Sequence, residues 1–174
     1  MDAGRIDDPA QWFFDAVVEP TAHEAITALN DMRRGCLACL ALSAMGEHFI
    51  HARRQMAQSI IQQHLPEQVP PRFPDKLGDY ERTAFWKALA ARCWDYGVVR
   101  DVANATKHVT PSGDKVGFDD VRNTRLGFGV SKFSWPFASE AILVDTGSGG
   151  PFMLSQLVHA SLAMWREIMS ESAA

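Results

Sequence analysis

Five polar side chains of the stretch RDVANATKH have the chemistry of an active or binding site. On a helix that turns about 100° per residue they fall within an arc of roughly 120°, and the opposite arc is apolar, as in an ordinary amphipathic helix. The residue types argue against a merely solvated face, because such faces usually consist of Glu, Lys and Gln, whereas Asn and His are poorer helix formers. Both interpretations stay open. The five residues are Arg100, Asp101, Asn104, Lys107 and His108.

The same stretch resembles a short Arg/Asn/Lys/His helix motif of bacterial all-helical proteins and, more distantly, the motif of HEPN domains. In HEPN domains an arginine, commonly followed by a polar residue, precedes a histidine by four to six intervening positions on one helix of a four- or five-helix bundle. Active members cleave RNA without a metal ion, often by pairing two motifs across a dimer. Here seven residues separate Arg100 from His108, and an alignment on Asn104 and His108 places Ala103 where the arginine belongs.

The resemblance covers the helices from Thr21 to His108 and implies a HEPN-like bundle. It further implies a nucleic-acid-associated or regulatory bacterial protein that acts as a homodimer and holds RNA in a polar cleft. On this hypothesis His108→Ala leaves the fold intact and abolishes RNA binding or cleavage. The residues implied are Arg100, Asn104 and His108 for catalysis, and Asp101 and Lys107 for binding.

The stretch GEHFIH offers a second candidate, a metal site. A Glu-x-x-His or His-x-x-His step places two ligands on one helix face, the spacing that metal sites inside helical bundles use. The stretch contains Glu47, His48 and His51 but occurs once, whereas di-iron bundles need a second motif and two further carboxylates. A structural role for these histidines and a metal-dependent enzyme both stay open, and no particular cofactor follows. Ligands from across the bundle would be Asp95, Asp101 or His108.

The aromatic run near the N-terminus suggests a third function, a non-catalytic interaction module. Trp12, Phe13 and Phe14 lie beside an acidic segment, since residues 1–31 hold seven acids against one arginine. Apolar surface of this kind marks protein contact sites, and Trp is enriched among their strongest contacts. The partner would then be another protein, whereas the HEPN-like interpretation expects RNA and a second copy of the chain.

Composition limits the classes of partner and location. The chain carries −4 at pH 7 with a pI near 5.8, which removes any overall attraction to nucleic acid or an anionic membrane. Polyanion binding therefore needs a local patch, and residues 80–132 supply one candidate with nine Lys/Arg against six acids. The longest apolar run is about half of a bilayer span. Because the first residues lack the features of an export signal and the cysteines form an odd set, we expect a cytoplasmic protein without membrane contact.

Proline positions and hydrophobic spacing predict the first helices. We expect a short helix that starts at the Asp-Asp-Pro sequence of residues 7–9 and ends before Pro20. A long second helix, capped by Thr21, is expected to run to Arg54 or Gln63. Four prolines within residues 64–79 then predict an extended crossing.

The second half of the chain combines helices with a β-rich segment. Helical spacing resumes over residues 80–94 and, after Asp95 and Gly97, again through His108, before Pro111 ends it. Residues 115–146 are rich in Val, Phe and Gly with partial alternation, which predicts two to four short strands. A last helix is expected from Pro151. The sequence thus predicts a single, mainly α domain over residues 1–174: an antiparallel bundle of four to five helices with a small β ribbon inserted before the C-terminal helix.

The relative placement of the two polar motifs separates the three functions. If His48 and His51 face the same cavity as Arg100 and His108, an enzyme or a nucleic-acid site is favoured. If the two motifs lie on separate open surfaces, the interaction module is favoured.

Overall fold

The computed structural model is mainly helical and describes residues 8–68, 77–107, 120–126, 135–136, 139–146 and 149–171. A small antiparallel sheet precedes the last helix, which confirms the predicted fold class. The helical elements are α1 (Pro9–Phe13), the π-helical turn η1 (Phe14–Val18), α2 (Glu19–Thr27), α3 (Met32–Ala52), α4 (Arg54–His64), the short 3₁₀ turn η2 (Pro66–Gln68), α5 (Asp79–Arg92), α6 (Trp94–Lys107) and α7 (Leu154–Glu171). The strands are β1 (Asp120–Arg125), β2 (Glu140–Asp145) and β3 (Pro151–Met153).

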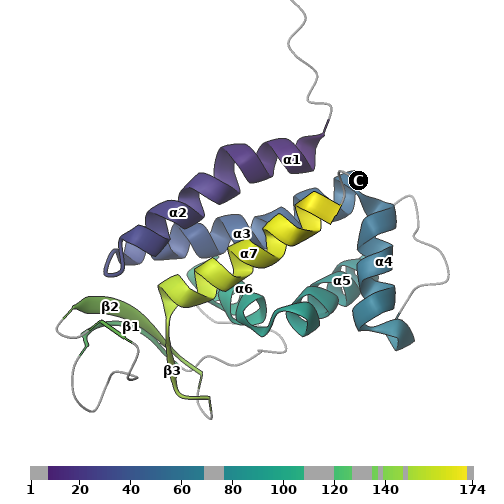
Figure 1. Ribbon diagram of the computed structural model, residues 1–174. Coiled ribbons are helices and arrows are strands. Elements are labelled where there is room, and N and C mark those ends of the chain that lie inside the picture. The colour runs from purple at the N-terminus through teal and green to yellow at the C-terminus, as the bar shows by residue number, and fades with distance from the viewer. Residues whose placement is uncertain are drawn as a thin grey trace, which may run out of the picture.

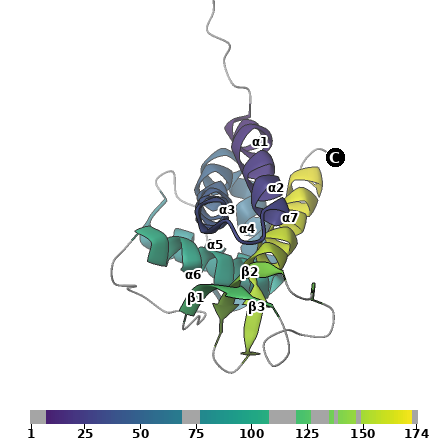
Figure 2. The same ribbon diagram turned by 90° about the vertical axis from the view of Figure 1, so that its left-hand side faces the viewer.

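Helix α3 occupies the centre of the bundle and packs against α2, α6 and α7. Figure 1 shows α1, α2 and α7 running alongside α3, with α5 and α6 below them and α4 across one end. At the opposite end the strands gather beside the start of α7 (Figure 2). Within the described ranges, no helix has both the length and the apolar composition to cross a bilayer.

Aromatic side chains from four helices meet in the core. Phe49 of α3 stacks on Phe85 of α5 with ring centroids 5.9 Å apart, and its ring lies 5.6 Å from that of Trp165 on α7. The rings of Tyr96, from α6, and Trp165 meet edge to face with centroids 5.9 Å apart. All four side chains are fully buried. Because large aromatic groups dominate the apolar area that a core removes from water, these contacts hold α3 and α6, the two helices that carry the polar motifs, against α5 and α7.

The first helical segment continues through Pro20, so the predicted stop before this residue is wrong. Helix α1 passes into η1 and then into α2, with Pro20 in the first turn of α2. A proline normally interrupts a helix because it lacks an N–H group and its ring collides with the carbonyl four residues earlier. The wider π turn directly before Pro20 relieves that conflict. Thr21 is consequently a helical residue and not a cap.

The predicted long helix is divided at two places. Helix α2 ends at Thr27, and α3 begins at Met32 after Asp31, whose carboxylate accepts a hydrogen bond from a backbone amide of the first turn at 3.1 Å. The second break is at Arg53, whose backbone is not helical (φ −128°, ψ 55°). Apolar spacing continues across both breaks, which is why periodicity alone predicted one helix. Asp31 caps the start of α3, and the non-helical backbone of Arg53 separates α3 from α4.

The β-rich segment forms a three-stranded antiparallel sheet in the order β1-β2-β3. The three strands agree with the predicted two to four. However, β3 lies beyond the predicted β-rich residues 115–146 and occupies Pro151–Met153, where the last helix was expected to begin. Helix α7 starts at Leu154, directly after Met153 of β3, so that no loop residue separates them.

Strand β2 attaches the sheet to the bundle. Ile142 and Val144 belong to the main core, whereas Ala141 and Leu143 pack in a smaller cluster on the other face of the strand, as the two-residue period of a strand requires. The amide of Ile142 also donates a hydrogen bond of 2.9 Å to the carbonyl of Leu29 in the turn between α2 and α3. The sheet is therefore held both by side-chain burial and by the backbone.

Candidate functional site

Only part of the predicted polar face of α6 is open to solvent. Asp101 is buried, with 7% of its surface exposed, because it lies at the edge of the apolar stripe of the helix. Arg100 and Asn104 are half-buried and Lys107 is exposed. His108 lies outside the described residues. The polar face is therefore not simply solvated, since Arg100 and Asp101 are covered at least in part by neighbouring residues.

Arg100 packs on an aromatic ring of α5. Its guanidinium carbon lies 4.6 Å from the centroid of the Trp86 ring, the geometry of a cation–π contact. Within the part of the chain that the structure describes, Arg100 forms no ion pair with a carboxylate. No local sequence pattern identified Trp86, because the helix that lies beside α6 depends on the fold. This contact holds a cation in place without neutralising it.

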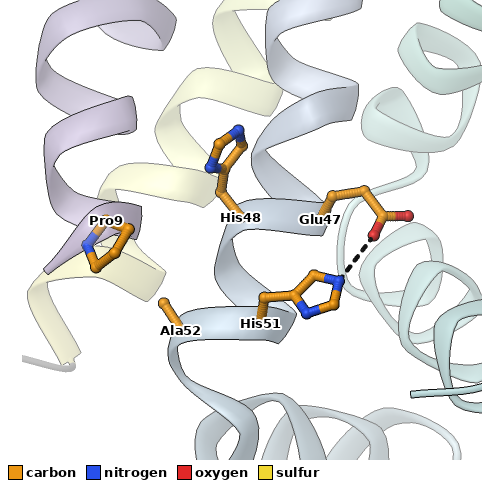
Figure 3. A pocket seen from close by; sticks show the side chains of 5 residues that line it. All are labelled: Pro9, Glu47, His48, His51 and Ala52. Atoms are coloured by element: carbon orange, nitrogen blue, oxygen red, sulfur yellow. Dashed lines mark ion pairs between the residues drawn. The ribbon is translucent and has the colours of Figure 1, made fainter. Parts of the chain in front are cut away.

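The side chains of the GEHFIH stretch point to two different neighbours. The His48 ring stacks on Phe13 of α1, with centroids 3.8 Å apart and an angle of 12° between the planes. Burial lowers the pKa of His48, and the charge of His51 lowers it further. His51 instead points toward Glu47, with 3.7 Å between Nε2 and the carboxylate Oε2 (Figure 3). The predicted pair of histidines is thus held by separate contacts.

A metal ion shared by His48 and His51 stays a prediction. Among the described residues, no three or more His, Cys, Asp or Glu side chains form a group that could hold a metal ion.

The GEHFIH stretch borders a cavity between α1 and α3. This cavity, of about 270 Å³, is lined by Pro9, Glu47, His48, His51 and Ala52 (Figure 3). A second hollow, of about 440 Å³, shares His51 and Ala52 and continues along the start of α4. Pro9 and Ala52 have no chemical signature in the sequence, so only the fold identifies them as lining residues.

Glu47 borders this cavity and also approaches α5. Its Oε2 atom lies 3.8 Å from Nε of Arg82 on α5, in addition to its contact with His51. Burial raises the pKa of the Tyr96 phenol, while the charge of Arg100 opposes the rise and the charge of Glu47 adds to it. The Tyr96 phenol is therefore close enough to both predicted motifs for Glu47 of α3 and Arg100 of α6 to affect its pKa. The motifs approach each other at the junction of α3, α5 and α6, although the lining residues of the cavity belong to α1 and α3.

Gly46 allows this junction to close. A Cβ atom at this position would lie 3.1 Å from Nε1 of Trp86 and 3.2 Å from the hydroxyl oxygen of Tyr96, which is tighter than ordinary van der Waals contact. The four-residue spacing of Arg82 and Trp86 places them on one face of α5, yet the sequence does not say which helix that face meets. Sequence reasoning missed Arg82, Trp86 and Tyr96 for this reason.

Tyr96→Phe is expected to raise the free energy of unfolding by about 1 kcal/mol. The Tyr96 hydroxyl is buried without a hydrogen-bond partner among the described residues, and such a group costs about 1–3 kcal/mol. Urea unfolding followed by circular dichroism measures the change. Tyr80→Phe, at a residue that is 57% exposed, is the control and should change stability by less than about 0.5 kcal/mol. A loss of stability in Tyr96→Phe would contradict the expectation.

The aromatic run near the N-terminus does not form one surface, which corrects the expectation of a three-residue patch. Trp12 is 50% exposed, Phe13 is covered in part by His48, and Phe14 is 4% exposed and belongs to the core. Helical rotation of about 100° per residue directs three consecutive side chains to different sides.

Comparison with protein-family models, with curated proteins and with solved structures finds no match for this chain.

Proposed function

We propose that this chain is a HEPN-like, RNA-binding protein of the bacterial cytoplasm, which works as a homodimer and binds RNA on the polar side of α6. The observation that carries the proposal is the state of Arg100. Its guanidinium is fixed over Trp86 and has no carboxylate counter-charge among the described residues. A positioned cation of this kind attracts an anion, and arginine pairs with phosphate through two parallel hydrogen bonds.

Two further side chains extend this surface along α6. Asn104 lies one helical turn beyond Arg100 and is half-buried, and Lys107 lies about another turn on and is exposed. An amide donates to and accepts from the edges of bases and riboses, whereas a lysine contacts phosphate as a point charge. His108, which follows, has the role of base in the proposal, by resemblance to the HEPN motif.

Arg100→Gln is expected to weaken RNA binding about tenfold or more. Hydrogen bonds to charged groups contribute about 1.5–3 kcal/mol, and about 1.4 kcal/mol corresponds to a factor of ten in affinity. Fluorescence anisotropy with a labelled single-stranded oligoribonucleotide measures the dissociation constant over a range of salt concentrations. Removal of one phosphate contact should also reduce the slope of log K against log salt by about one.

Arg125→Gln is the matched control for this experiment. Arg125 is an exposed arginine at the end of β1, so the substitution makes the same change in net charge at another place. It is expected to leave the dissociation constant within about twofold. The proposal is wrong if the unmodified protein does not bind RNA at low salt, or if the two variants lose affinity equally.

A further inference from the structure

We propose that the cavity between α1 and α3 binds an unpaired guanine base of the RNA. The inference rests on the proposed RNA-binding function and gives that function a base-specific pocket. The pocket contains an aromatic platform, a carboxylate and two apolar walls, and it is lined by Pro9, Glu47, His48, His51 and Ala52.

The aromatic platform is the pair formed by Phe13 and His48. Phe13 covers one face of the imidazole at 3.8 Å, while His48 itself is exposed and borders the cavity. Burial, together with the charge of His51, lowers the pKa of His48, so the ring is largely neutral at pH 7. Proteins that bind single-stranded RNA stack unpaired bases on aromatic side chains, histidine included. A base in the cavity would extend the existing stack by one ring.

The carboxylate of Glu47 has capacity for new hydrogen bonds. Its contacts with His51 and Arg82 are 3.7 and 3.8 Å long, which is longer than hydrogen bonds between nitrogen and oxygen. Both contacts involve Oε2, and the Glu47 side chain is 37% exposed. An ionised carboxylate only accepts hydrogen bonds and offers about four lone-pair sites. The group therefore suits a ligand with two adjacent donors.

Guanine is the base that presents two adjacent donors on its Watson–Crick edge. Its N1–H and exocyclic N2–H₂ groups match the two oxygens of a carboxylate. Adenine pairs one amino donor with the N1 lone pair, cytosine pairs one amino donor with the N3 lone pair, and uracil has a single N–H between two carbonyls. Each of these bases directs at least one lone pair at a carboxylate oxygen, which leaves polar groups unpaired and repels them.

The size and position of the cavity agree with a single base. Its volume of about 270 Å³ is just below the range of roughly 300–1,000 Å³ for pockets that hold drug-sized ligands. Glu47, which lines the cavity, lies 3.8 Å from Arg82 of α5, and the charges of Glu47 and of Arg100 on α6 both act on the Tyr96 phenol. The base and the phosphates would thus bind to neighbouring parts of one surface.

Isothermal titration calorimetry with guanosine 5′-monophosphate and adenosine 5′-monophosphate tests the pocket. The unmodified protein is expected to bind the guanine nucleotide about tenfold more tightly or better, which is the discrimination that a bidentate base contact provides. Glu47→Gln should bring the two affinities within about twofold, because an amide has only one acceptor oxygen. Glu24→Gln, at an exposed position of α2, removes the same charge elsewhere and should keep the preference.

Two substitutions of His48 test the platform separately. His48→Ala removes the ring and should weaken both nucleotides about equally, whereas His48→Phe keeps an aromatic face and should retain the affinity and the preference. Circular dichroism establishes that each variant is folded. Equal affinities of the unmodified protein for the two nucleotides, or a preference that persists in Glu47→Gln, would overturn the inference.

Oligoribonucleotides distinguish this inference from the proposed function. Anisotropy is measured with one strand that contains guanines and one in which adenines replace them. If both strands bind with the same affinity, the guanine pocket is wrong while RNA binding stands. If neither strand binds but the guanine nucleotide does with the expected preference, the pocket is supported and the proposed RNA-binding function is overturned.

Discussion

We expect Trp165→Ala to lower the free energy of unfolding by about 3–5 kcal/mol, the range for removal of a large aromatic side chain from a core. Trp165 is fully buried and contacts Phe49 and Tyr96. The substitution therefore removes apolar contacts to α3 and α6 at once and leaves a cavity where α7 meets them.

Urea unfolding followed by far-ultraviolet circular dichroism measures this loss, with the midpoint and the slope fitted separately. Trp12→Ala is the control, because Trp12 is 50% exposed and its removal should change stability by less than about 1 kcal/mol. A loss below about 1 kcal/mol in Trp165→Ala would show that α7 does not depend on this contact. The aromatic core described above would then be wrong.

Arg53→Ala is expected to lower the free energy of unfolding by about 1.5–3 kcal/mol, the worth of hydrogen bonds to a charged group. The Arg53 guanidinium donates to the carboxylate of Asp8 (Nε to Oδ2, 3.1 Å), to Gln11 at 3.3 Å and to the sulfur of Met169 at 3.6 Å. Its side chain is only 14% exposed. The substitution therefore releases the start of α1 from both the α3–α4 break and the end of α7.

The effect of Arg53→Ala should depend on pH in a defined direction. Burial raises the pKa of Asp8, but backbone hydrogen bonding and Arg53 outweigh it, so that the pKa lies below its usual value. A carboxyl group with a depressed pKa in the folded state adds stability above its unfolded pKa of about 3.9, and that stability is lost as the pH falls further. The difference in the free energy of unfolding between Arg53→Ala and the unmodified protein should therefore become smaller below about pH 4.

Unfolding curves at pH 7 and pH 3 measure this dependence. Arg33→Ala, at an exposed position in the first turn of α3, serves as the control and should change stability little at either pH. An equal loss for Arg53→Ala at both pH values would contradict the assigned role of the Asp8 carboxylate.

Helix ends were predictable where the cause is local. The start of α1 after Asp8 is confirmed, since this carboxylate accepts hydrogen bonds from the amides of Ala10 and Gln11 at 2.9 and 3.0 Å, a signal contained in four residues. At the other break, the Arg53 side chain pairs with Asp8, 45 residues earlier in the chain. Apolar spacing records which side of a helix is buried, and it does not record such a contact.

In the candidate site too, the chemistry of a residue was predictable from the sequence, whereas the neighbour that it contacts in the fold was not. Helical geometry placed Arg100 and Asp101 on one polar arc, but depth depends on the neighbouring helices, and Asp101 is buried. The chemistry of Glu47 and His51 was readable from the sequence. The two motifs meet at Trp86 of α5, which lies against both Gly46 and Arg100 and which no local pattern identified.

Strand β3 continues directly into α7, so that the sheet and the last helix are joined without a loop. Since Met153 and Leu154 are consecutive, there is no connecting residue whose backbone rotation could reorient the strands independently of the helix. The same helix carries the buried indole of Trp165 three turns further on. One uninterrupted stretch of backbone therefore joins the small sheet to the aromatic core.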